Sequence, residues 1–293
     1  MTEQKLHLPV MLEQALQLLN INPDGIYIDG TFGRGGHSNA ILNKLSAKGK
    51  LIAFDQDPDA VQYAKTNIND SRFNIFHDNF TNHPQHLKSI NVNSVDGILL
   101  DLGICSTQID EGDRGFSFMR DATLDMRMNS TTGMTAAEWL KTASAEEISE
   151  VLWFYGEEKF SRKIAQAIYN ARGSLQTTFD LAELIKNTLP YRDKHKHPAT
   201  RSFQAIRIFI NDELNVLDNM MNLAPLMLSP KGRLVVISFH SLEDRIVKRK
   251  FQDWAVNNKE YSIIAKKLKP TQSEIDRNRR SRSAIMRSLE KTL

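Results

Sequence analysis

A glycine-rich segment that follows a short β-prone run carries the clearest chemical signal in the sequence. Residues 29–37 read DGTFGRGGH, and glycines at such a turn let the backbone approach a ligand without a Cβ clash. The helix that begins there would offer free backbone N–H groups and the positive end of its dipole. A second acid, Asp55, lies 26 positions after Asp29, at the end of the next predicted strand. An acid at that place in a Rossmann-like sheet hydrogen-bonds a ribose diol, so the pattern predicts a nucleoside-containing ligand.

The spacing of the glycines favours one kind of nucleoside. It is GxxGxGG, and not the GxGxxG of dinucleotide-binding folds. Asp29, directly before the glycines, would repel a pyrophosphate but attract the ammonium and sulfonium groups of S-adenosylmethionine. Asp101, at the end of a later strand, completes the ordered set of acids. We therefore expect S-adenosylmethionine as the cofactor; a nicotinamide-dependent oxidoreductase, or a turn that is merely tight, is the alternative.

Strands and helices alternate in the part of the chain that would position these residues. Helical spacing is found at residues 9–19 and 36–46 and again after Pro58, and β-prone runs occupy residues 26–29, 50–55, 73–76 and 95–101. Alternation of this kind predicts an α/β fold, with a parallel sheet covered by helices. The pattern returns near Thr200, where we expect a long helix toward Leu228, a turn at 230–232, and strands at 233–239 and 283–289.

The stretch between these parts has almost no strand signal. Two capping boxes, Thr135 with Glu138 and Ser144 with Glu147, predict helix starts, and residues 157–172 and 179–189 are helical by spacing. We therefore predict a discontinuous Rossmann-like domain of residues 1–108 and 199–293, interrupted by an all-α insert of residues 109–198.

Composition places limits on the setting. No apolar run reaches the ~18 residues that span a bilayer, and the N-terminus lacks an apolar signal-peptide core. Cys105 is the only cysteine, which excludes an intramolecular disulfide and a cysteine-rich zinc site. These features predict a cytoplasmic protein without a membrane partner. The net charge of +3 divides into +6 over residues 266–293, where nine basic residues face three acidic ones, and −3 elsewhere. A basic tail of this kind neutralises phosphates, or is simply a solvated end.

Five longer blocks make the resemblance to a known family specific. They are DGTFGRGGHS (29–38), GILLDLG (97–103), RGFSFMRDATLDMRM (114–128), KHPATRSFQAIRI (196–208) and ISFHSLEDRIVK (237–248). Together they resemble the bacterial ribosomal RNA small subunit methyltransferase H family over nearly the whole chain. The resemblance implies a class I S-adenosylmethionine-dependent methyltransferase domain interrupted by a helical substrate-recognition domain. It also implies methylation of N4 of a cytidine in the decoding region of 16S rRNA, with the small ribosomal subunit as partner.

The same resemblance assigns the cofactor-binding residues block by block. Gly35, Gly36 and His37 match the donor-binding glycine turn, and Asp55 matches the ribose-binding acid. Phe80 matches a cofactor-contacting aromatic residue, for which stacking on adenine is the physical reason. Asp101 and Gln108 match the remaining cofactor contacts. The sequence departs from the family pattern before Gln108, where Cys105 and Thr107 replace a serine and a proline.

Several of these residues also have a purely structural interpretation. Phe80 would serve equally as a core residue, His37 as a helix-start hydrogen-bonding group, and Asp101 as a turn cap. The charged block around Arg114 and Arg127 is either a salt-bridged loop or a loop that shapes the cytidine pocket. His195, His197 and His240 lack a metal-ligand spacing, so we expect solvent or phosphate contacts there and no metal.

The target base must leave its stack to be methylated. The surfaces expected to hold RNA are the helical insert, the basic tail, and the segment with Lys196, His197, Arg201 and Arg207. The chain has no (S/D/N)PP(Y/F) motif, so no catalytic residue is assigned, and the sequence predicts no oligomeric state. A non-catalytic RNA-binding or ribosome-assembly factor is the remaining alternative.

Overall fold

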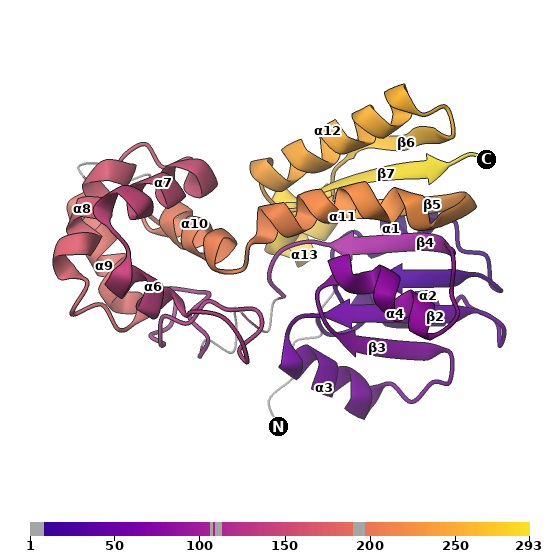
Figure 1. Cartoon of the computed structure of the whole chain (residues 1–293), viewed down its shortest axis with the longest axis horizontal. Helices are drawn as coiled ribbons and strands as arrows, with labels where there is room; N and C mark the ends of the chain where they lie inside the picture. The colour runs from indigo at the N-terminus through magenta and orange to yellow at the C-terminus, as the bar shows by residue number, and fades with distance from the viewer. Residues whose placement is uncertain (1–8, 106–107, 109–112, 190–196) are drawn as a thin grey trace. The chain divides into compact units, whose positions relative to one another are not determined.

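The computed structural model describes residues 9–105, 108, 113–189 and 197–293 (Figure 1). The chain forms two compact units, one of Met1–Gly103 with Leu214–Leu293 and the other of Ile104–Glu213. No helix in the described ranges is both long and apolar enough to cross a membrane.

A seven-stranded sheet organises the first unit, in the order β3-β2-β1-β4-β5-β7-β6. β7 is antiparallel to both of its neighbours, and the pairs among the first five strands are parallel. The strands are β1 (Ile26–Asp29), β2 (Lys50–Asp55), β3 (Phe73–His77), β4 (Val95–Asp101), β5 (Leu228–Ser238), β6 (Tyr261–Leu268) and β7 (Ile285–Lys291). The predicted Rossmann-like sheet is confirmed, and the carboxyl ends of β1, β2 and β4 meet at one edge.

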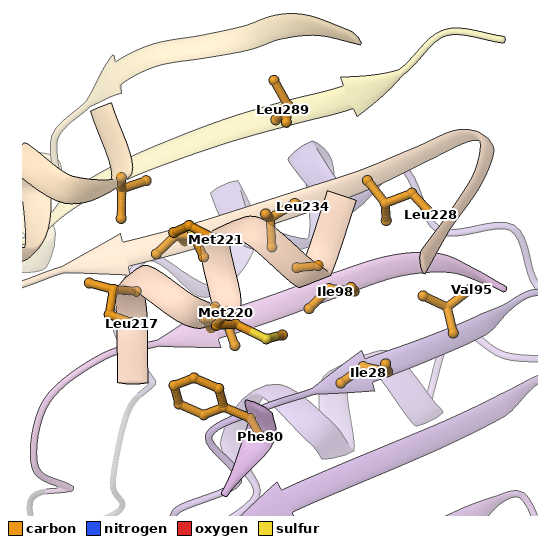
Figure 2. Close-up of a cluster of buried hydrophobic side chains, with 14 of the residues drawn as sticks. Ile28, Phe80, Val95, Ile98, Leu217, Met220, Met221, Leu228, Leu234 and Leu289 are labelled. Atoms are coloured by element: carbon orange, nitrogen blue, oxygen red, sulfur yellow. The ribbon is translucent and has the colours of Figure 1, made fainter. Parts of the chain in front are cut away.

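Helices cover both faces of this sheet because its strands alternate their side chains between two apolar clusters. Leu217 and Met221 of one cluster pack over Ile98 and Leu234 (Figure 2), while Leu16 of the other packs with Tyr27 and other residues of the opposite face. The helices are α1 (Leu12–Leu19), α2 (Gly36–Leu42), α3 (Pro58–Asn67), α4 (His83–Ser89), α11 (Glu213–Met227), α12 (Ser241–Asn257) and α13 (Gln272–Arg277), with 3-10 turns η1 (Phe80–Asn82) and η2 (Arg279–Ser283).

The second unit is built from helices around its own core. Both predicted capping boxes are present, and a third joins Thr177 to Asp180 at the start of another helix. The helices are α6 (Ala136–Thr142), α7 (Ala145–Gly156), α8 (Ser161–Ala171), α9 (Thr178–Thr188) and α10 (Thr200–Ile210).

The units divide at other residues than the sequence suggested. We expected the α/β part to resume at residue 199, but α10 belongs to the helical unit, because Phe203, Ala205 and Ile206 are buried in that unit's core. The earlier division falls after Gly103 and not after residue 108.

Two expectations for the returning α/β part were wrong. The single helix toward Leu228 is divided into α10 and α11, with Asp212 between them in the left-handed region at φ 51°. The turn at 230–232 lies inside β5, where the register against β4 shifts between Val95 and Gly97. The irregular pairing of β4 with β5 thus allows the turn-forming residues 230–232 to remain within the strand.

Candidate cofactor-binding site

The turn after β1 is held by a buried carboxylate. Asp29 is 1% exposed; one oxygen accepts from the Ser38 hydroxyl at 2.6 Å and the other from the Thr31 N–H at 3.1 Å. Burial is the largest influence on its pKa and raises it, although both hydrogen bonds oppose that shift. We expected Asp29 to face the cationic end of a ligand. Each oxygen thus accepts one bond from the turn that presents the glycines, and the role of Asp29 toward a cationic ligand stays a prediction.

Two glycines of this turn adopt backbone conformations that L side chains rarely adopt. Gly33 has φ 57° and Gly35 has φ 73°. A Cβ atom on Gly35 would lie 2.8 Å from the ring of Phe32, so the position excludes other residues both by conformation and by space. Gly35 is the N-cap residue of α2, and this fixes the direction in which Gly36 and His37 leave the turn.

Asp55, at the end of β2, accepts two backbone hydrogen bonds. Its Oδ2 accepts from the Gly33 N–H at 2.7 Å and its Oδ1 from the Asp57 N–H at 2.8 Å. Burial raises the pKa of Asp55 to about 6 against the lowering effect of these bonds. A carboxylate has roughly four lone-pair sites, so the ionised form retains capacity for a pair of ribose hydroxyls.

His37 is buried, and its ring has a defined tautomer. Nε2 lies 3.1 Å from the Val10 carbonyl oxygen, which only accepts, so Nε2 carries the proton. The bare Nδ1 lies 3.6 Å from Oδ2 of Asp101. Burial lowers the pKa of His37, which favours the neutral ring. With only 5% of the residue exposed, the His37 side chain supports the turn from within.

Asp101 ends β4 beside this turn, and one of its oxygens provides a test of fit. Its backbone N–H donates to Thr31 Oγ1 at 2.7 Å, but the buried Oδ1 has no hydrogen-bond partner among the described residues. Burial, followed by the carboxylates of Asp29 and Glu243, raises the pKa of Asp101 well above its usual range. An unpaired buried acceptor costs about 1–3 kcal/mol. A cationic ligand with N–H donors, such as S-adenosylmethionine, would relieve both the unpaired oxygen and the surplus of negative charge.

Phe80 and Gln108 differ from the other predicted site residues. Phe80 follows β3 as expected, but the residue is only 7% exposed and its ring lies in the apolar cluster near Met220 (Figure 2). Burial leaves the ring little surface for stacking on adenine, so the packing of Phe80 favours the core role that the sequence also allowed. Gln108 belongs to the second unit, where its Oε1 accepts from the Cys105 N–H at 3.0 Å. Residues 106, 107 and 109–112 lie outside the described residues.

Glycine and strand-end patterns do not reveal a further buried acid, Glu243, at this edge of the sheet. Glu243 is 2% exposed, and its Oε2 accepts from the backbone N–H groups of Phe239 and His240 at 2.8 and 3.3 Å. The signal was a capping box in HSLE, in which the His240 Nδ1 takes the place of a hydroxyl.

A sheet of this order with a glycine turn between carboxylates at its parallel strand ends defines a class I methyltransferase. The chain belongs to the MraW methylase family, whose profile matches residues 4–292. The cofactor is S-adenosylmethionine.

Two relatives cover almost the whole chain, and both are called ribosomal RNA small subunit methyltransferase H. The one from Pseudoalteromonas atlantica is 47% identical over 310 residues, covering 99% of this chain and 100% of the relative. The one from Hydrogenovibrio crunogenus is 48% identical over 307 residues, covering 99% of this chain and 98% of the relative. The crystal structure of an rRNA methylase from Streptococcus thermophilus overlaps 96% of this chain and 93% of that one, at 11% identity and a TM-score of 0.40.

Proposed function

We propose that the chain transfers a methyl group from S-adenosylmethionine to N4 of a cytidine in the decoding region of 16S rRNA, with the small ribosomal subunit as its partner. The observation that carries the proposal is the Asp101 oxygen left unpaired beside the glycine turn. The names of relatives 47% and 48% identical to nearly the whole chain support the RNA substrate.

We assign the cofactor contacts to seven residues. Gly35, Gly36 and His37 would hold the donor through their backbone, Asp55 would accept from its ribose hydroxyls, and Asp101 would face its cationic groups. The turn at Phe80 would lie against the adenine through groups other than its buried ring. Gln108 completes the set, which is Gly35, Gly36, His37, Asp55, Phe80, Asp101 and Gln108.

The bound cofactor supplies an electrophilic methyl group. Cytidine N4 is a poor nucleophile because its lone pair is delocalised into the ring, so the protein must align the two atoms at ~3–3.5 Å. An oxygen that accepts an N4–H bond would localise the lone pair and stabilise the positive charge that develops. We assign no residue as that acceptor.

Binding of RNA is assigned to the helical unit and to the basic tail. Arg277, Arg279, Arg280 and Arg282 of the tail are exposed, as phosphate contacts require. Arg201 is exposed as well. Arg207, which we expected among the RNA contacts, instead forms a bidentate pair with Glu213 at 2.7 and 2.8 Å, with side chains only 12% and 10% exposed.

The test is methyl transfer to small ribosomal subunits taken from cells that lack this enzyme. The purified chain is incubated with isotope-labelled S-adenosylmethionine, and the rRNA is digested to nucleosides for mass spectrometry. We expect label in N4-methylcytidine, mapped to the decoding region. Label in any other nucleoside would contradict the N4 assignment, and no label at all would favour a non-catalytic assembly factor.

A further inference from the structure

A pair of aromatic rings, one partly buried and one exposed, lies in the helical unit. The rings of Phe118 and His197 are stacked, with centroids 4.4 Å apart and planes inclined by 26°. Phe118 is anchored from below by an edge-to-face contact with Phe203 at 5.1 Å and 79°, and Phe203 is buried in the unit's core. His197 is itself exposed. Phe118 thus covers one face of the His197 imidazole, and the exposed imidazole is supported by the packed rings of Phe118 and Phe203.

Hydrogen bonds fix the orientation of this imidazole. The Ala199 N–H donates to Nδ1 at 3.2 Å, and the Thr200 N–H donates to the His197 carbonyl oxygen at 3.1 Å. Since Nδ1 accepts, Nε2 carries the proton of the neutral ring. Partial burial, followed by the charge of Lys186, lowers the pKa of His197, so the ring is neutral at physiological pH. A neutral ring cannot form an ion pair with a phosphate. Because Nδ1 accepts from the Ala199 N–H, Nε2 carries the proton and has no lone pair for a metal.

We propose that Phe118 and His197 form a platform on which an unstacked base of the RNA substrate stacks. The proposal rests on the proposed function, which supplies the RNA. Single-stranded RNA is recognised by stacking its bases on aromatic side chains, with cations close enough to attract the phosphates. Lys186 supplies such a charge, although it also pairs with Glu183, and the neighbouring Met119 adds apolar surface at 79% exposure. Rigid aromatic rings lose little conformational freedom on binding.

Three variants of the full chain test this proposal by fluorescence anisotropy. His197→Asn removes the ring but keeps an acceptor for the Ala199 N–H, so α10 retains its start. His197→Tyr keeps an aromatic face. Phe154→Ala removes an aromatic side chain of the same unit that is 63% exposed and outside the platform. The probes are a labelled single-stranded RNA with the decoding-region sequence and the same sequence as a duplex, whose bases are already stacked.

We expect His197→Asn to weaken single-strand binding roughly tenfold, since stacking on an aromatic side chain is worth about 1–3 kcal/mol per base. His197→Tyr and Phe154→Ala should bind the single strand as the unaltered chain does, and none of the variants should change duplex binding. Unchanged binding by His197→Asn, a loss with His197→Tyr as large as with His197→Asn, or an equal loss on the duplex would each overturn the platform.

The binding measurement needs no turnover, so it separates the two proposals. If the unaltered chain fails to methylate small subunits, the proposed function fails, whatever the anisotropy gives. If it methylates them while His197→Asn binds RNA normally, only the platform fails. Thermal unfolding and cofactor affinity of each variant confirm that folding is retained. Should His197→Asn not fold, Phe118→Leu removes the supporting ring at similar volume and should show the same roughly tenfold loss.

Discussion

The backbone N–H of Gly33 donates to Oδ2 of Asp55 at 2.7 Å, and this bond joins the turn after β1 to the end of β2. The two strands are neighbours in the sheet, so their carboxyl ends are already adjacent. The bond adds orientation, because it points the carboxylate along the glycine turn. A single change at either residue therefore alters both the turn and the acid proposed to bind ribose.

Asp55→Asn should weaken binding of S-adenosylmethionine about 10- to 100-fold, since a hydrogen bond to a charged group contributes about 1.5–3 kcal/mol. The amide oxygen can still accept the Gly33 N–H, but the amide nitrogen cannot accept the Asp57 N–H, so thermal unfolding of the variant must be compared with that of the unaltered chain. Isothermal titration calorimetry measures the effect. Asp59→Asn, at an exposed acid in the first turn of α3, is the matched control and should leave the affinity unchanged.

Cofactor affinity should also depend on pH through the same carboxyl. Burial raises the pKa of Asp55 to about 6, so the unliganded group gains a proton as the pH falls through that value. Ribose hydroxyls donate preferentially to the ionised form, so the dissociation constant should rise by up to about tenfold per pH unit below about 6. Binding should correspondingly release protons near pH 6. Titrations from pH 5 to 8 should show this slope in the unaltered chain and lose it in Asp55→Asn; the same slope in both would contradict the assignment.

Gly35→Ala should destabilise the turn and abolish tight cofactor binding. Its left-handed backbone costs an L residue roughly 1–2 kcal/mol, and the added Cβ would also meet the Phe32 ring at 2.8 Å. Gly133→Ala separates the two effects, because Gly133 has φ 81° but nothing within 4 Å of a Cβ atom. Unfolding in urea should show a lower free energy of unfolding in both variants, because both place an L residue in the left-handed region. The decrease should be larger in Gly35→Ala. Equal losses would mean that the Phe32 contact is unimportant.

Arg207→Ala should lower the free energy of unfolding of the helical unit by about 3–5 kcal/mol, because it leaves Glu213 as an unpaired, largely buried charge. Lys186→Ala breaks a pair with Glu183 in the same unit that is partly open to solvent, and should lower the free energy of unfolding by only about 0.5 kcal/mol. Circular dichroism in urea compares the two. A stable Arg207→Ala variant with weakened RNA binding would restore Arg207 as an RNA contact.

Replacing Arg279, Arg280 and Arg282 with Glu should raise the Michaelis constant for small ribosomal subunits. The difference from the unaltered chain should grow as the salt concentration falls, because phosphate contacts release counterions. The three side chains are exposed, so the fold should tolerate the change. Cofactor affinity should not move. An unaltered Michaelis constant would count against the tail as an RNA-binding surface.

The elements that the sequence predicts well are those with a strong local signal. The strand at Ile26–Asp29 and the capping box at Thr135 both form where expected, because residues only a few positions apart in the sequence determine each of them. β6 was not predicted, since two irregularities in its pairing with β7 disturb the alternation of its side chains. The assignment of α10 to the helical unit was also not predictable, because it depends on which core accepts Phe203.

For the site, the sequence predicts positions better than roles. Asp29, His37 and Asp101 lie together at the strand ends as expected. Whether a carboxylate faces a ligand or its own backbone depends on where Ser38 and Thr31 lie in space, which spacing alone does not reveal. Phe80 has a core role for the same reason, since its burial depends on helix α11, far away in sequence.

The helical unit is one uninterrupted stretch of chain, whereas the sheet is assembled from segments on either side of it. During translation, residues 104–213 are therefore complete before β5 has been synthesised, and they can fold while β4 still lacks its neighbour on that side. The same delay affects β6 at the edge of the sheet, because β6 is synthesised before β7, the strand with which it pairs. A nascent chain thus carries unpaired strand edges until β7 leaves the ribosome. A chaperone would be most useful during this interval.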